Sequence, residues 1–167
     1  MGVSNTRRCW NMFQLPESVE SACNVGCCGI DGCVSTLVGA SLVNPDRLCY
    51  VVVGDLTFFY DLNSLGNHHI GTNLRVMLVN NGRGTEFRLG IHHCNVFGDD
   101  ADKYMAAAGH FGNKSPLLVK HYAEDLGFHY LSATTKEEFM TALSNFTNPQ
   151  LSDHSMILEV FTDSKDE

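Results

Sequence analysis

The sequence predicts an α/β fold, a three-layer sandwich in which a mainly parallel sheet carries helices on both faces. Two apolar runs at 48–55 and 74–81 are rich in β-branched residues and end in polar residues, as strands buried on both faces do. A segment with helical spacing, 59–66, lies between them and stops at Gly66. This strand–helix–strand unit indicates that the two strands are parallel.

The same alternation continues through the rest of the chain. A Gly-rich turn at 26–32 opens a helix of small residues. Thr135 and Glu138 predict a capping box at the start of a later helix. The expected elements beyond the second strand are helices at 99–112, 115–127 and 134–146 and strands at 128–133 and 155–162. The pattern predicts one domain at 1–162 and a solvated tail at 163–167.

Composition excludes several classes of protein. With 167 residues, of which 44% are hydrophobic, the chain can bury a core as a globular domain. The net charge of −8 argues against nucleic acid as a partner. We expect no membrane span, because no apolar run reaches about 18 residues. The N-terminus lacks the apolar core of a signal peptide, so we expect a cytoplasmic protein.

The cysteines leave a metal site open as an alternative. There are seven, an odd number, which favours reduced thiols in a protein without a secretion signal. Four of them lie between Cys23 and Cys33. A zinc-binding protein is one reading, but zinc ligands usually come as two short, well-separated pairs, and this spacing is irregular. We favour cysteine as a small hydrophobic residue near a tight turn.

Polar residues follow two neighbouring strands at the points where they end. Asp55 follows the first strand, and Asn80 and Asn81 end the second. The carboxyl ends of parallel strands share one edge of a sheet, so these side chains can reach one point. Carboxylate and amide oxygens suit Mg²⁺ or Ca²⁺, and the Gly-rich turn at 26–32 could present amides to a phosphate. The alternative is that Asp55 is a helix N-cap without a metal.

Four short motifs together resemble one enzyme family. Gly-Asp at 54–55 and Asn-Asn at 80–81 resemble the metal–diphosphate motif of thiamine-diphosphate-dependent enzymes. Gly-Ile-Asp-Gly at 29–32 and Tyr-Asp-Leu-Asn at 60–63 look most like the 2-succinyl-5-enolpyruvyl-6-hydroxy-3-cyclohexene-1-carboxylate synthase family of menaquinone synthesis, a relative of acetolactate-synthase-like enzymes. The resemblance covers nearly the whole chain and corresponds to the C-terminal, diphosphate-binding domain of that family.

The resemblance implies a magnesium site and a cofactor site. The side chains of Asp55 and Asn81 and the main-chain carbonyl of Arg83 would bind Mg²⁺. Ile30 would be the wedge that keeps thiamine diphosphate bent. The other cofactor contacts implied by the family are Gly29, Gly54, Leu56 and Thr57, and the substrate contacts are Ser4, Arg8 and Phe87.

The resemblance also implies what the chain needs from elsewhere. The Glu that activates the cofactor in the family belongs to a pyrimidine-binding domain, so we expect no catalytic residue in this chain and a partner domain or subunit in a homo- or hetero-oligomer. The predicted function is the thiamine diphosphate and Mg²⁺ binding half of a transferase or lyase that decarboxylates a 2-oxo acid. The alternative is a non-catalytic remnant or interaction subunit that keeps the fold.

Three positions depart from the family pattern. Val25 stands where the family has an Arg, Glu86 stands where it has an apolar residue, and the loop at 80–84 reads Asn-Asn-Gly-Arg-Gly. These departures put the identity of the substrate in doubt. Another 2-oxo acid is therefore as good a candidate as the 2-oxo acid that the menaquinone enzyme uses.

Overall fold

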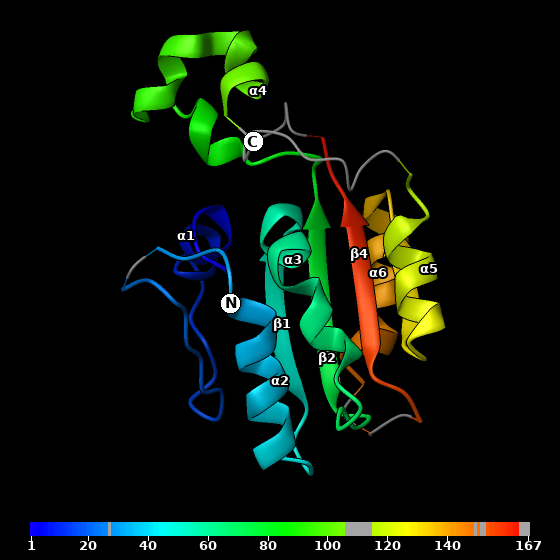
Figure 1. Cartoon of the computed structure of the whole chain (residues 1–167). Helices are drawn as coiled ribbons and strands as arrows, with labels where there is room; N and C mark the ends of the chain where they lie inside the picture. Colours follow the sequence, from blue (N-terminus) through cyan, green and yellow to red (C-terminus); the bar gives the residue numbers. More distant parts are fainter. Residues whose placement is uncertain (27, 106–114, 149, 151–152, 164–167) are drawn as a thin grey trace.

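The sheet of the computed structural model has four strands, and all are parallel (Figure 1). The structure describes residues 1–26, 28–105, 115–148, 150 and 153–163. The strands are β1 (Cys49–Gly54), β2 (Leu74–Asn80), β3 (His129–Ala133) and β4 (Met156–Phe161), in the order β1-β2-β4-β3. The predicted α/β fold with a parallel sheet is therefore confirmed.

Helices α2, α5 and α6 fall close to the predicted segments, whereas α1 was not predicted. The α-helices are α1 (Asn5–Trp10), α2 (Cys33–Val43), α3 (Asp55–Asp61), α4 (Ala101–Tyr104), α5 (Leu118–Asp125) and α6 (Lys136–Phe146). The 3₁₀ helices are η1 (Leu62–Gly66), η2 (Thr85–Arg88) and η3 (His93–Asp100). The capping box of Thr135 and Glu138 at the start of α6 is present as predicted. Residues 106–112 of the helix predicted at 99–112 lie outside the described residues.

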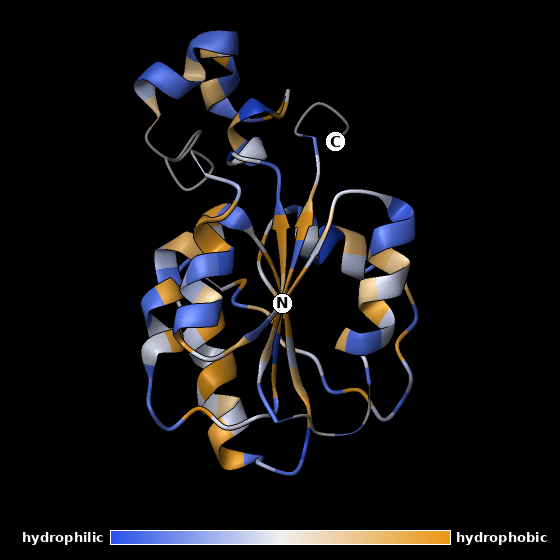
Figure 2. Cartoon of the chain, turned by 90° about the vertical axis from the view of Figure 1, so that its right-hand side faces the viewer, coloured by the Kyte–Doolittle hydropathy of each residue, from blue (hydrophilic) through white to orange (hydrophobic). Residues whose placement is uncertain are grey.

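Alternate residues of the strands pack into two separate cores. On β2, Val76 and Leu78 belong to a cluster with residues of α2, α3 and α5, whereas Met77 packs with residues of α6. Successive strand residues point to opposite faces of a sheet, so the two clusters lie on opposite faces. Figure 2 shows helices on both sides of the sheet. The predicted three layers follow from this arrangement.

The carboxyl ends of the strands carry the loops that matter for function. Helix α3 starts at Asp55, directly after β1, and β2 leads into the loop at 81–84. Figure 1 shows α1 and the segment that contains α4 at this same end of the sheet. Within the part of the chain that the structure describes, no helix is long and apolar enough to span a membrane.

Candidate functional site

Asp55 is a buried carboxylate at the carboxyl end of β1. Only 3% of the residue is exposed, and its Oδ1 accepts a hydrogen bond from the amide of Leu56 at 2.7 Å. The N-cap of α3 is Gly54, and Asp55 is the first residue of the helix, so the alternative reading of Asp55 as an N-cap is wrong. A carboxylate in the first turn is still favoured by the helix dipole. Asp55 lies at the same end of the sheet as the polar residues after β2.

The loop after β2 is folded around two asparagine side chains. Asn80 Oδ1 accepts a hydrogen bond from the Gly82 amide at 3.2 Å, and Asn81 Oδ1 accepts one from the Arg83 amide at 3.2 Å. Gly82 has a φ of +83°, which favours glycine in this turn. Because Gly54 pairs with Val79, the residues that follow both strands lie at one edge of the sheet, as predicted. An amide oxygen has two lone pairs and can accept more than one contact.

Glu159 supports this loop, and no sequence motif pointed to it. The residue is 1% exposed on β4, and its Oε1 accepts a hydrogen bond from Asn80 Nδ2 at 2.7 Å. Its Oε2 accepts one from the Tyr130 hydroxyl at 2.7 Å. Burial raises the pKa of Glu159, and the charge of Asp55 acts in the same direction. The signal in the sequence is a single charged residue inside the apolar run at 155–162.

We expect stability to depend on the titration of Glu159. Its pKa is raised in the folded state, so the folded chain holds the proton more tightly, and that contribution is lost as the pH rises above 4.5, the ordinary value for Glu. Urea unfolding of wild type and Glu159→Gln at several pH values on both sides of 4.5 measures this. The free energy of unfolding of wild type should fall relative to that of the variant as the pH rises. If the difference in free energy of unfolding between wild type and Glu159→Gln does not change with pH, the raised pKa of Glu159 is wrong.

Asp61 ties the Gly-rich turn to α3. Its Oδ2 accepts hydrogen bonds from the Ser35 amide at 2.7 Å and from the Ser35 hydroxyl at 3.0 Å. Ser35 lies in the first turn of α2, whose N-cap is Gly32 with a φ of +77°. These two hydrogen bonds therefore fix the turn that ends at Gly32 relative to α3, the helix that begins at Asp55. Gly29 and Ile30 are half-buried in this turn, and their contact with a cofactor stays a prediction.

Replacing Asp61 should weaken the fold through this contact. Asp61→Ala leaves the amide and hydroxyl of Ser35 without their acceptor, which costs roughly 1–3 kcal/mol for a buried polar group. Asp61→Asn keeps an acceptor oxygen and should lose clearly less. Urea denaturation followed by circular dichroism compares the two variants, and equal losses would mean that the carboxylate charge, rather than the hydrogen bonds, carries the effect.

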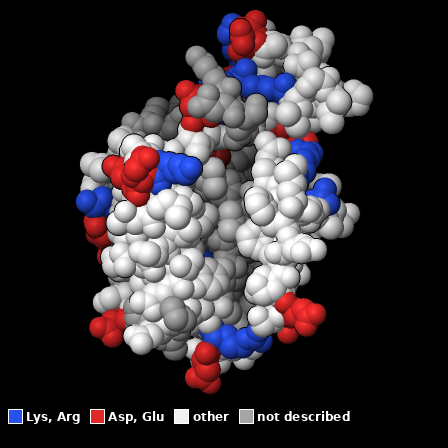
Figure 3. All heavy atoms as spheres, turned by 180° about the vertical axis from the view of Figure 1, so that it is seen from behind, with Lys and Arg blue, Asp and Glu red and all other residues white. Residues whose placement is uncertain are grey.

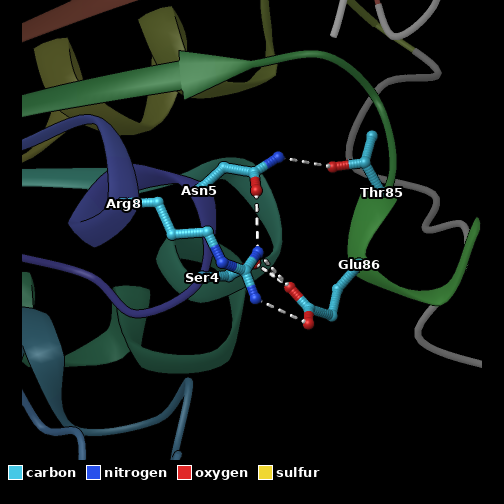
Figure 4. A network of polar contacts seen from close by, with 5 residues as sticks. All are labelled: Ser4, Asn5, Arg8, Thr85 and Glu86. Atoms are coloured by element: carbon cyan, nitrogen blue, oxygen red, sulfur yellow. Dashed lines mark hydrogen bonds and ion pairs between the residues drawn. The ribbon is translucent and has the colours of Figure 1, made fainter. Parts of the chain in front are cut away.

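Ser4 and Arg8, the predicted substrate contacts, bind a carboxylate of the chain itself. The guanidinium of Arg8 donates to both oxygens of Glu86, at 2.9 and 3.1 Å, and the Ser4 hydroxyl donates to Glu86 as well (Figure 4). The hydrogen bonds lower the pKa of Glu86 and raise that of Arg8. Phe87, the third predicted substrate contact, lies edge-on to His92 with ring centres 5.1 Å apart.

The remaining predicted residues have clear places in the structure. The Leu56 amide donates to Asp55, and Thr57 is buried in the first turn of α3. Arg83 Nη2 lies 3.9 Å from Asp102 Oδ2. The main-chain amide of Arg83 donates to the side chain of Asn81 in the loop after β2. Their roles toward a metal or cofactor stay predictions.

The zinc alternative finds no support in the described residues. Among them, no three His, Cys, Asp or Glu side chains come together as a metal site. The described cysteines are free thiols, and Cys27 lies outside the described residues. The oxygen donors at the carboxyl ends of β1 and β2 are of a different kind, because Mg²⁺ usually takes only one or two carboxylates and completes its shell with other oxygen ligands. The buried Asp55 carboxylate and the Asn81 amide oxygen fit that ion.

These features define a parallel α/β domain with oxygen donors at the carboxyl ends of neighbouring strands. No protein-family model matches the chain. Among curated proteins, it is 36% identical over 159 residues to the 2-succinyl-5-enolpyruvyl-6-hydroxy-3-cyclohexene-1-carboxylate synthase of Bacteroides fragilis, a match that covers 95% of the chain and 27% of that enzyme. The synthase of Phocaeicola vulgatus is 36% identical over 165 residues, or 97% of the chain and 28% of the enzyme.

A third synthase extends the similarity to another genus. That of Christiangramia forsetii is 35% identical over 164 residues, covering 98% of the chain and 26% of the enzyme. The chain is thus distantly homologous, over most of its length, to one domain-sized part of these synthases, and it spans about a quarter of their length.

Proposed function

We propose that this chain is the thiamine diphosphate and Mg²⁺ binding half of a cytoplasmic enzyme that decarboxylates a 2-oxo acid and joins the product to an acceptor. The observation that carries the proposal is that buried Asp55 and the Asn80–Asn81 loop follow the carboxyl ends of two neighbouring parallel strands, in a chain homologous to part of the synthases. When bound, thiamine diphosphate would supply the electron sink that a 2-oxo acid needs to lose CO₂.

The chain's own residues would hold and orient the cofactor. Asp55 and Asn81, with the carbonyl of Arg83, would bind Mg²⁺, and Mg²⁺ would bind the diphosphate. The hydrogen bonds from Tyr130 to Glu159 and from Asn80 to Glu159 keep the loop in place without help from a ligand. A site held by packing and hydrogen bonds loses little entropy when it binds.

Exposed apolar side chains near this edge support the need for a partner. Met12 and Phe13 follow α1 and are 79% and 72% exposed, and Ile91 and Val96 are 90% and 82% exposed in the segment that contains η3. Large apolar side chains that gather on a surface mark interaction sites. We propose that a pyrimidine-binding domain or subunit covers them and supplies the activating Glu.

Titration calorimetry of thiamine diphosphate into the chain, with and without Mg²⁺, tests the proposal. We expect heat of binding with Mg²⁺ present and none with the metal removed. If neither titration gives binding, the experiment is repeated with a pyrimidine-binding domain of a homologous synthase. Binding that appears only in that mixture would support the proposal that this chain supplies half of the cofactor site. No binding in any mixture would favour the non-catalytic alternative.

A further inference from the structure

A row of hydrogen bonds crosses three strands of the sheet and ends at the loop after β2. The Tyr130 hydroxyl on β3 donates to Glu159 Oε2 on β4 at 2.7 Å. Glu159 Oε1 accepts from Asn80 Nδ2 at the end of β2, also at 2.7 Å. Asn80 Oδ1 then accepts from the Gly82 amide at 3.2 Å. Both ends of the Asn80 side-chain amide are therefore bonded, one toward the sheet and one toward the loop.

These bonds lie inside the sheet, where a charge is unusual. Figure 3 shows acidic and basic side chains on the surface of one face of the molecule. Glu159 is 1% exposed and Asn80 is 6% exposed. Both oxygens of Glu159 accept, which is the pattern of an ionised carboxylate. Hydrogen bonds to a charged group are short and strong in a buried place, so they hold their partners more firmly than the bonds of a surface turn do.

The two ends of the row have distinct parts. Burial and the hydrogen bond to Glu159 raise the pKa of Tyr130, so its hydroxyl keeps its proton and remains a donor at neutral pH. At the other end, Asn80 directly precedes Asn81, which we propose as a metal ligand. The charge of Asp55, the other proposed side-chain ligand, contributes to the raised pKa of Glu159. The row thus ends beside both proposed ligands, and its residues would act on a metal only through position.

The rigidity of a loop affects which divalent ion it binds. Mg²⁺ needs nearly octahedral ligands at about 2.0–2.1 Å, whereas Ca²⁺ accepts flexible arrangements at about 2.3–2.6 Å. A loop that is held in one conformation therefore favours Mg²⁺, and a loosened loop loses Mg²⁺ more than Ca²⁺. Groups that orient a metal ligand without touching the metal usually change metal affinity roughly 10–100-fold.

We infer that Tyr130, Glu159 and Asn80 are positioning residues that make the loop after β2 selective for Mg²⁺ over Ca²⁺. They do so by fixing Asn80 and therefore its neighbour Asn81. The metal part of this inference rests on the proposed function, whereas the order that the row gives to the loop does not.

Amide hydrogen exchange without any ligand tests the order of the loop. Tyr130→Phe removes only the hydroxyl that begins the row. The matched control is Tyr122→Phe, because the part-buried Tyr122 hydroxyl donates to the Leu62 carbonyl in η1, at 2.8 Å, and not to the loop. We expect the Gly82 amide to exchange roughly threefold faster or more in Tyr130→Phe. Exchange should not change in Tyr122→Phe, and equal exchange in all three proteins would overturn the inference.

Calorimetry of thiamine diphosphate in Mg²⁺ and in Ca²⁺ tests the selectivity. We expect Tyr130→Phe to bind roughly tenfold more weakly in Mg²⁺ and no more than about threefold more weakly in Ca²⁺. Tyr122→Phe should keep both affinities. The ratio of the two affinities is the readout, because a general loss of stability would lower both alike.

The possible results separate the inference from the proposed function. If Tyr130→Phe lowers both affinities equally, or neither, the inference is wrong and the proposed function stands. If the wild type binds thiamine diphosphate with neither ion, alone or with the pyrimidine-binding domain of a homologous synthase, both are overturned. A fall in the affinity ratio in Tyr130→Phe alone would support both.

Discussion

Asp55→Asn is expected to abolish the Mg²⁺-dependent binding of thiamine diphosphate. The variant keeps an oxygen that can accept the Leu56 amide but loses the charge that a divalent cation requires. We expect affinity to fall roughly a hundredfold or more, which is about 2.8 kcal/mol. Thermal unfolding gives a second readout, because a ligand at about 100 times its Kd stabilises the folded state by about 2.7 kcal/mol. The wild type should show this stabilisation and the variant should not.

The matched control is Asp46→Asn. Asp46 is exposed in the turn that precedes β1, at the opposite end of the strand from Asp55. It loses the same charge, so any general effect of net charge on binding the anionic cofactor appears in both variants. Equal binding by wild type, Asp46→Asn and Asp55→Asn would show that Asp55 holds no metal and that its burial serves α3 alone.

The strands were predictable because their burial leaves a direct pattern. The runs at 51–53 and 76–79 are continuous apolar stretches, and a sheet covered on both faces favours them. The helix α1 was not predicted. Six residues that include Asn, Thr and Cys have low helix propensity, and the contacts of Arg8 with Asn5 and Glu86 hold them in place.

The segment at 99–112 shows a second limit. It reads as one helix, but in its described part only Ala101–Tyr104 is α-helical, and the residues before it form a 3₁₀ helix. Gly98, directly before this segment, has φ 49° and ψ −129°, a conformation that glycine adopts freely, and it breaks the 3₁₀ helix η3. A composition of good helix formers does not reveal such a break.

The candidate site also has one part that the sequence predicts and one part that it does not. The positions of Asp55 and Asn81 were predictable because each follows a strand, and the carboxyl ends of neighbouring parallel strands lie side by side. The bond between Glu159 and Asn80 joins residues 79 positions apart, and the bond between Arg8 and Glu86 joins residues 78 apart. Periodicity carries no information about such pairs. The sequence marks Glu86 only as a departure from the family, and its partner follows from the fold.

Phe58→Ala is expected to cause the largest loss of stability. Phe58 is 1% exposed, lies in the core between α3 and the sheet, and packs edge-on to Phe59 with ring centres 5.6 Å apart. Removing a buried Phe costs about 3–5 kcal/mol through lost burial and the cavity left behind. A domain has only about 5–15 kcal/mol of stability, so the variant should unfold at much lower urea.

Tyr60→Ala is the control on the same helix, because Tyr60 is 56% exposed and loses little burial. We expect it to cost less than about 1 kcal/mol in urea unfolding followed by circular dichroism. The comparison also tests the site, because Phe58 packs α3, the helix that begins at Asp55, against the sheet. If the two variants lose the same stability, α3 is not packed as described. The burial of the Asp55 carboxylate, and with it the metal-ligand role that we propose for Asp55, would then be wrong.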